Sequence, residues 1–120
     1  MSSDVLSTFI TAAVASTTAV SANAAVANNA ALVLTASPYV MDAARKLTIT
    51  SAGDDDEISF TIVGLDQNGD AVTESLTGAN AGVVTSVNYF SSITSITAVG
   101  DPAGNVSAGT SNDVSALIYG

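Results

Sequence analysis

From residue 37 onward, apolar and polar residues alternate along the chain, and this period of two constrains the fold more than any other feature. The clearest case is residues 58–63 (ISFTIV), where large apolar side chains alternate with Ser, Thr and Val. Residues 47–50 (LTIT) alternate in the same way. In an extended strand, successive side chains point to opposite faces. Each segment is therefore predicted to be a strand with one buried face.

Turn-forming residues separate these segments. Residues 66–70 (DQNGD) lie between strands predicted at 60–65 and 71–77, and Asn68-Gly69 supplies the positive φ that a tight hairpin needs. Further turns are predicted at 51–56, 78–82 and 100–105, and further strands at 83–89, 93–99, around Val106 and at 114–119. Seven or eight short strands at this spacing predict an all-β fold, either an antiparallel β-sandwich or a small barrel.

The first 36 residues have a different composition. They contain one charged residue, Asp4, no Gly and no Pro, and consist mainly of Ala, Ser, Thr, Val and Asn. Val5 and Phe9 fall at helical spacing, whereas Thr17-Thr18 and Val20 favour extended chain. We expect residues 1–36 to form an N-terminal arm, extended or partly helical, that is ordered by packing on a partner. Residues 37–120 are expected to form a single β-sandwich domain.

This N-terminal segment is not expected to be a signal peptide or a membrane span. Ala22-Asn23-Ala24 imitates a cleavage site, but Asp4 stands where a signal peptide has positive charge. Hydroxyl and amide side chains interrupt every stretch of about 18 residues that a membrane span would need.

The charged residues exclude several classes of function. The 120-residue chain has 11 acidic and two basic residues (Arg45, Lys46), a net charge of −9, and no His, Cys or Trp. Without His and Cys the usual general base, the thiolate nucleophile and the commonest metal ligands are missing. The negative charge repels nucleic acid and anionic membranes. We therefore predict a non-enzymatic protein with no catalytic residue, no cofactor, and no nucleic-acid or membrane partner.

The low density of charge has two interpretations. Only 11% of the residues are charged, compared with about 25% in an average soluble domain. Either part of the surface is covered in an assembly, or a Ser/Thr-rich β domain uses hydroxyl groups for solubility.

The acidic run at residues 54–57 could supply oxygen ligands for calcium. Sequential residues in extended chain alternate between faces, so the four carboxylates do not converge unless the turn folds back on itself. We expect a solvated turn whose charges also deter edge-to-edge strand pairing.

A second acidic motif imitates part of an EF-hand loop. Asp66, Asn68 and Asp70 match its first three ligand positions. Ala71 stands where the loop needs Gly, and Thr77 stands where it needs a bidentate Glu. We therefore expect a hairpin turn, and no metal ligand is predicted.

Glu74 is unusual because it shares a strand face with Val72 and Leu76. Three explanations remain open. A bulge could re-aim its side chain, the charge could guard a sheet edge, or it could contact Arg45 or Lys46.

Three segments resemble a pattern found in small virion proteins of tailed bacteriophages. They are residues 45–53 (RKLTITSAG), 58–69 (ISFTIVGLDQNG) and 72–78 (VTESLTG), and the similarity continues through 81–85, 89–90 and 93–97. The resemblance implies a β-sandwich or barrel, often dimeric or trimeric, that decorates or cements the outer surface of a capsid. It also implies that the partner is the major capsid protein or another virion protein, that synthesis takes place in the host cytoplasm, and that there are no catalytic residues.

The N-terminal arm is the predicted contact with that partner. Ten of the eleven carboxylates follow residue 36, so the acidic sandwich is expected to face solvent while the arm lies on a neighbouring subunit. The predicted interface residues are the larger apolar side chains of the arm, which are Val5, Phe9, Ile10, Val14 and Val20.

Two other interpretations are kept. A phage tail or head-fibre component would share the β composition. An immunoglobulin-like bacterial surface adhesion module would also fit the strands, although such a module normally has an export signal and flanking linkers.

Overall fold

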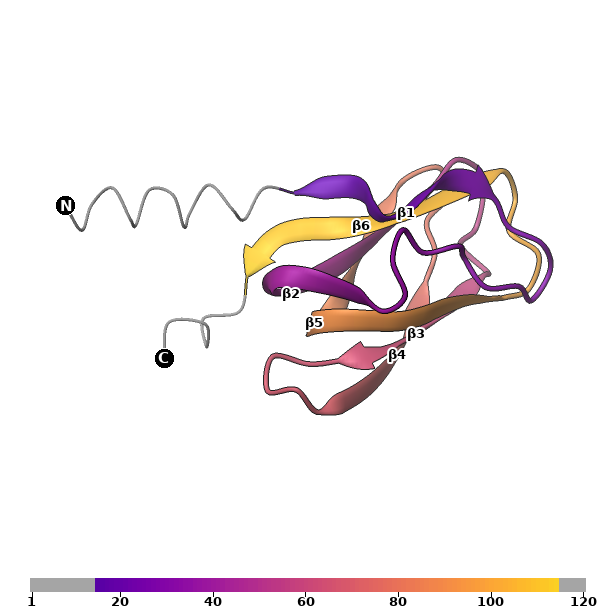
Figure 1. The fold of residues 1–120 in the computed structure, drawn as a ribbon. Coiled ribbons are helices and arrows are strands. Elements are labelled where there is room, and N and C mark those ends of the chain that lie inside the picture. Colours follow the sequence, from indigo (N-terminus) through magenta and orange to yellow (C-terminus); the bar gives the residue numbers. More distant parts are fainter. Residues whose placement is uncertain (1–14, 115–120) are drawn as a thin grey trace.

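The computed structural model describes residues 15–114. Six β-strands and no helix lie within these residues. The strands form one antiparallel sheet in the order β1-β6-β2-β5-β3-β4 (Figure 1). The predicted all-β, antiparallel fold is confirmed. The sheet is not closed into a barrel, because β1 and β4 remain its two edges. The strands are β1 Ser16–Ala25, β2 Tyr39–Ser51, β3 Ser59–Leu65, β4 Ala71–Thr77, β5 Val83–Val99 and β6 Asn105–Val114.

The long strand β5 makes the sheet sandwich-like. Its first part pairs with β2, from Val83 to Ile93, and its last part pairs with β3, from Ser92 to Val99. The partner strand changes near Ser92, so β1, β6 and β2 lie on one side of the molecule and β3 and β4 on the other (Figure 1). The inner faces of both parts enclose one core, whose largest fully buried side chains are Phe60, Phe90, Leu47, Ile49, Ile62, Ile93, Ile96, Val20 and Val106.

The β3–β4 hairpin forms where the sequence predicts it. The pairing runs in register from Ser59 opposite Thr77 to Leu65 opposite Ala71. Gly69 in the loop has a φ of 82°, which a residue with a Cβ rarely adopts. The turn between β3 and β4 is thus specified locally, by the glycine that the turn requires.

Residues 16–36 belong to the sheet and its core, so the expectation of an arm is wrong for them. β1 pairs with β6 from Ser16 opposite Thr110 to Ala25 opposite Asn105, and Val20 is completely buried. A Cβ on Gly109 would collide with the backbone where β1 passes, so β6 is shaped to receive β1. The small side chains that suggested a weak core allow this close approach. Residues 1–14 lie outside the described part of the chain.

The connection between β1 and β2 joins the two sides of the fold. The N–H of Leu32 donates to the carbonyl of Ile96 at 2.8 Å, which fastens this connection to β5. The N–H of Thr35 donates to the carbonyl of Val20 at 2.8 Å, which fastens it to β1. Leu32 itself is a core residue. Hydrogen bonds and core contacts therefore link residues on both sides of position 36, where the composition changes.

One pair of predicted strands is a single strand in the structure, and one predicted strand is longer than expected. The strands predicted at 83–89 and 93–99 form one 17-residue strand, β5, because the chain bends at its change of partner without reversing. The strand predicted around Val106 extends through Val114 as β6. Of the strand predicted at 114–119, only Val114 lies within the described residues.

Candidate interaction surface

The outer side of the β4–β3–β5 layer carries a regular array of small hydroxyl side chains. Thr61 lies at its centre, opposite Ser75 on β4 and Thr97 on β5. Neighbouring strands are about 4.8 Å apart and alternate residues about 6.6 Å apart along a strand, so the nine outward side chains form a three-by-three grid. We call this grid the hydroxyl face. It consists of Ser59, Thr61, Val63, Thr73, Ser75, Thr77, Ser95, Thr97 and Val99.

The inner residues of the same strands explain why the hydroxyl face points outward. Phe60 and Ile62 alternate with the outward residues of β3 and are fully buried. A register slip of one residue would exchange the two sets and expose the core side chains. The hydrophobic core therefore fixes the orientation of the hydroxyl face.

The uncharged surface continues beyond β5 onto residues 29–35. Ala31 forms a β-bridge with Thr97, so this segment lies beside the hydroxyl face. Val33 follows it and is 85% exposed, more than any other large apolar residue in the described range. Val99, at the end of β5, is 54% exposed. Ala31 and Val33 therefore add apolar surface beside the hydroxyl face, of which Val99 is already a member.

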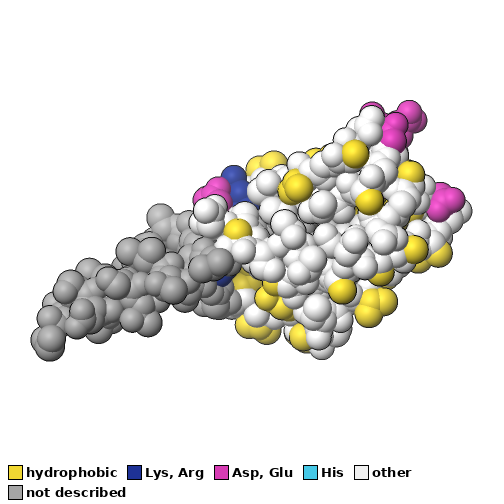
Figure 2. Space-filling model, turned by 90° about the horizontal axis from the view of Figure 1, so that it is seen from above, with side chains coloured by type: hydrophobic (Ala, Val, Ile, Leu, Met, Phe, Trp, Pro, Cys, Tyr) yellow, Lys and Arg dark blue, Asp and Glu magenta, His cyan; other side chains and the backbone are white. Residues whose placement is uncertain are grey.

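An open groove of about 320 Å³ lies between β1 and this segment. The hydroxyl of Ser21 donates to the carbonyl of Val33 at 2.7 Å, and that of Thr35 donates to the carbonyl of Ala19 at 2.7 Å. In Figure 2, which shows the molecule from above, most described side-chain atoms are hydrophobic or uncharged polar, and the charged atoms lie beside the grey residues and at the opposite end. The groove is lined by Ser21, Ala22, Ala24, Ala25, Val26, Ala31, Leu32, Val33, Leu34, Thr35 and Val106.

Carboxylates lie at both ends of the hydroxyl face. The acidic turn 54–57 immediately precedes β3, and Asp101 follows β5, so both lie at one end. Asp66 follows β3 and Asp70 precedes β4, so both lie at the opposite end. Asp54, Asp56, Glu57, Asp70 and Asp101 are exposed. The surface is therefore uncharged in the middle and acidic at its two ends.

The four carboxylates of the acidic turn do not converge. Asp55 is fully buried and its Oδ1 accepts the N–H of Ala103 at 2.7 Å, while Asp54 and Asp56 are exposed. The pKa of Asp56 is raised above its usual value, first by the side-chain hydrogen bond with Asp54 and then by the negative charges of Asp54 and Glu57. Within residues 15–114, no group of three or more acidic side chains is arranged to hold a metal ion.

The EF-hand-like motif forms the hairpin loop. Asp66 Oδ1 accepts the N–H of Asn68 at 2.8 Å and the N–H of Asp70 at 3.0 Å. This carboxylate oxygen is therefore an acceptor for the turn itself, which is the local hydrogen bonding that favours Asp at such positions.

The carboxylate of Glu74 on β4 reaches a bulge in β5, a strand that does not pair with β4 in the sheet. The pairing of β2 with β5 shifts between Lys46 and Thr48. In this stretch Glu74 accepts the backbone N–H groups of Val87 at 2.9 Å and Asn88 at 3.0 Å. Glu74 itself lies opposite the buried Ile62 in a regular pairing of β3 with β4, so no bulge in its own strand re-aims its side chain. It is an inward carboxylate on an edge strand, and it accepts hydrogen bonds at the bulge of β5.

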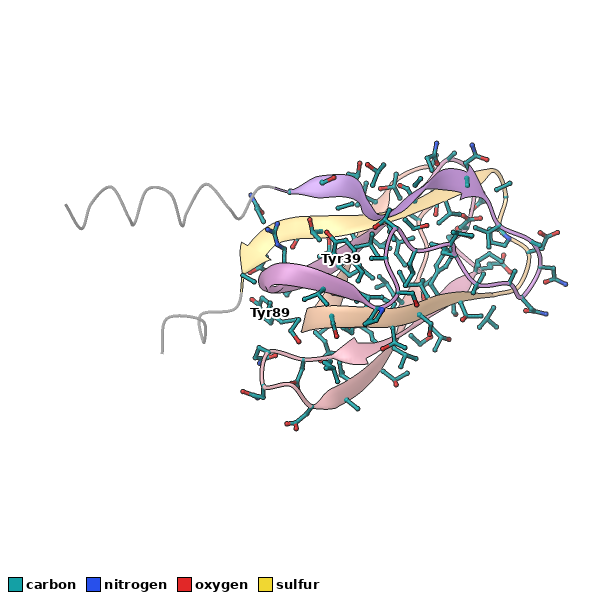
Figure 3. The ribbon with its side chains drawn as sticks, in the orientation of Figure 1. Tyr39 and Tyr89 are labelled. Atoms are coloured by element: carbon teal, nitrogen blue, oxygen red, sulfur yellow. The ribbon has the colours of Figure 1, made fainter. Side chains whose placement is uncertain are left out.

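Both basic residues lie in β2 and have acceptors on β6. Arg45 is buried, and its Nη1 donates to the carbonyl of Ser111 at 3.1 Å. Lys46 Nζ lies 3.4 Å from the carboxylate of Asp113 and 5.4 Å from the ring centroid of Tyr89. Tyr89 is labelled in Figure 3. The Tyr89 hydroxyl donates to Asp113 at 2.9 Å, and this hydrogen bond is the main cause of the raised pKa of Tyr89.

Only one of the five predicted interface residues, Val20, lies in the described part of the chain. Val20 lies in the core of this chain, so it is not available to a partner in this structure. The other four, Val5, Phe9, Ile10 and Val14, lie outside the described residues. The hydroxyl face could have been found from the polar half of the alternation at residues 59–63, 73–77 and 95–99, which carries Ser, Thr and Val but no charge.

No protein-family model matches this sequence, and no curated protein or solved structure matches it. Among residues 15–114 there is no helix long and apolar enough to cross a membrane. The resemblance to phage virion proteins therefore stays a prediction.

Proposed function

We propose that the chain is a non-enzymatic virion structural protein that binds the outside of a bacteriophage capsid and stabilises it. The observation that carries this proposal is the hydroxyl face with its extension to Ala31 and Val33, an ordered outer surface without a single charged side chain. The residues that resemble small phage virion proteins include most of the strands that build it.

The chemistry of the hydroxyl face suits lasting contact with another protein. The cores of protein interfaces are depleted of charged residues, because a buried charge must be desolvated. Ser and Thr lose little side-chain entropy on burial compared with Lys or Glu. Each hydroxyl can both donate and accept, so the partner must supply matching groups. The major capsid protein or another virion protein is the proposed partner.

Decoration of a symmetric capsid compensates for weak individual contacts. Small side chains such as Thr61 and Ser75 bury little apolar area, so one copy of the interface gives modest affinity. A dimeric or trimeric form of the chain would engage two or three sites together, which raises the overall affinity without new contacts. This is the oligomeric state that the resemblance implies.

The test is binding of the purified chain to virions produced without it, measured by co-sedimentation. The unaltered chain should bind in many copies per particle, and labelled chain should be seen on the capsid by electron microscopy. Label confined to the tail would favour the tail-component alternative, and no sedimentation with particles would contradict the proposal.

Variants then test the surface. Thr61→Lys and Ser75→Lys place a charge in the hydroxyl face, and each should weaken binding by roughly tenfold or more. The matched control is Asn112→Lys, which adds the same charge at an exposed position of β6. Thermal melting should show that all three variants fold. Equal binding by the Thr61 and Ser75 variants would exclude the hydroxyl face as the contact.

A further inference from the structure

The carboxylates at the two ends of the hydroxyl face indicate which charges a partner surface should have. Asp101 at one end and Asp70 at the other are exposed, as are Asp54, Asp56 and Glu57 of the acidic turn. The two basic residues of the chain lie in β2 and have acceptors on β6. The carboxylates at the ends of the face are thus left to interact with solvent or with a partner.

We infer that the surface bound by the hydroxyl face is an uncharged patch with Lys or Arg side chains at both ends, and that it belongs to a different protein. This inference rests on the proposed function, since it describes the partner of the same face. An uncharged centre with charged ends is a typical interface arrangement, in which the rim charges steer association and select the partner.

A second copy of the chain is a poor occupant of the hydroxyl face. If two faces stacked with their strands aligned, each acidic end would lie against an acidic end. Reversing one copy gives the same result, because both ends carry carboxylates. Like charges brought together across an interface cost free energy and suppress the wrong pairing. Dimers or trimers of the chain would therefore form through other surfaces.

Crowding at one end adds to this argument. The side-chain hydrogen bond with Asp54, followed by repulsion from the negative charges of Asp54 and Glu57, raises the pKa of Asp56. A partner cation at this end would relieve that repulsion. A partner carboxylate, as supplied by a second copy, would increase it.

The first experiment measures how salt and end charges affect binding to virions produced without the protein. Affinity of the unaltered chain should fall as NaCl is raised, because salt screens exposed ion pairs. Asp70→Asn and Asp101→Asn should each weaken binding roughly threefold at low salt, and the double variant roughly tenfold with a weaker salt dependence. Asn112→Lys changes the net charge in the same direction away from the face, and should not weaken binding.

The second experiment is sedimentation equilibrium of the isolated chain. Thr61→Lys should leave the oligomeric state unchanged. Loss of a dimer or trimer in this variant would show that the hydroxyl face binds a second copy, which would overturn the inference.

The outcomes separate the two proposals. If the unaltered chain binds virions and the double variant binds equally well at every salt concentration, the inference about basic ends is wrong while the proposed function stands. If the unaltered chain does not bind virions at any salt concentration, the proposed function fails, and the inference fails with it.

Discussion

Glu74 on β4 holds Asn88 on β5 at two points, accepting its backbone N–H at 3.0 Å and its side-chain amide at 2.9 Å. The other carboxylate oxygen accepts the N–H of Val87 at 2.9 Å. These donors lie where the pairing of β5 with β2 is interrupted. The hydroxyl of Ser86 acts in the same stretch, accepting the N–H of Leu47 and donating to the carbonyl of Asn88, both at 2.8 Å. Two side chains thus supply the acceptors that a regular strand pair would provide.

Glu74→Gln should destabilise the fold. The carboxylate accepts three hydrogen bonds, whereas the amide brings its own donor toward those N–H groups and carries no charge. We expect the free energy of unfolding to fall by about 1–2 kcal/mol, measured by urea denaturation. Asp70→Asn, at an exposed position of the same hairpin, is the control. An unchanged urea midpoint for Glu74→Gln would show that the carboxylate does not hold the bulge.

Gly109→Ala tests whether β1 belongs to the fold. The added Cβ would collide with the backbone of Ser16 and Thr17, so either β1 moves or β6 does. We expect a loss of about 3 kcal/mol in the free energy of unfolding and faster hydrogen exchange of the β1 amides. Gly82→Ala is the matched control, because a Cβ there meets only ordinary contacts. Equal stability of the two variants would argue against the pairing of β1 with β6.

The acidic turn predicts a pH-dependent stability. A raised pKa means that the folded chain binds a proton at Asp56 more tightly than the unfolded chain does. Ionised Asp56 therefore destabilises the fold above that pKa, and the penalty disappears as the pH falls through it. Asp56→Asn should melt at a higher temperature than the unaltered chain at pH 7, with a difference that shrinks in acid and in high salt. Asp101→Asn, which removes a charge from another exposed loop, is the control. A difference independent of pH would contradict this assignment.

The hydrogen bond between Tyr89 and Asp113 predicts a spectroscopic shift. Because that bond is the main cause of the raised pKa of Tyr89, Asp113→Asn should lower the pKa toward the ordinary phenol value. The measurement is the ultraviolet absorbance of the phenolate during an alkaline titration. Tyr89→Phe identifies which step belongs to this residue. An unshifted titration in Asp113→Asn would mean that Asp113 does not control Tyr89.

Local sequence signals are sufficient to predict the β3–β4 hairpin. The alternation of residues 58–63 identifies which side chains face the core, and Asn68-Gly69 identifies the turn. The hydroxyl face follows from the same alternation once the strand order is known. The order itself depends on long-range pairing between β5 and both β2 and β3, for which the sequence has no local signal.

The predictions for β1 and for the middle of β5 were wrong for the same physical reason, because irregular strand pairing removes the period of two. β1 has irregular register with β6 at two points, so its inward residues do not follow a period of two, and Val20 is buried through tertiary packing alone. The bulge in β5 removes the regular alternation near Val87, which is 77% exposed. The composition of residues 1–36, with one charged residue, therefore suggested an arm, although the residues from 16 onward complete the sheet and the core.

Binding of the hydroxyl face to a capsid is tested most directly by a cryo-electron microscopy reconstruction of capsids decorated with this chain. We expect Thr61 and its neighbours on the hydroxyl face to lie against the capsid protein, with Asp70 and Asp101 near Lys or Arg side chains of that partner. A reconstruction in which the hydroxyl face is open to solvent, and another surface makes the contact, would contradict it.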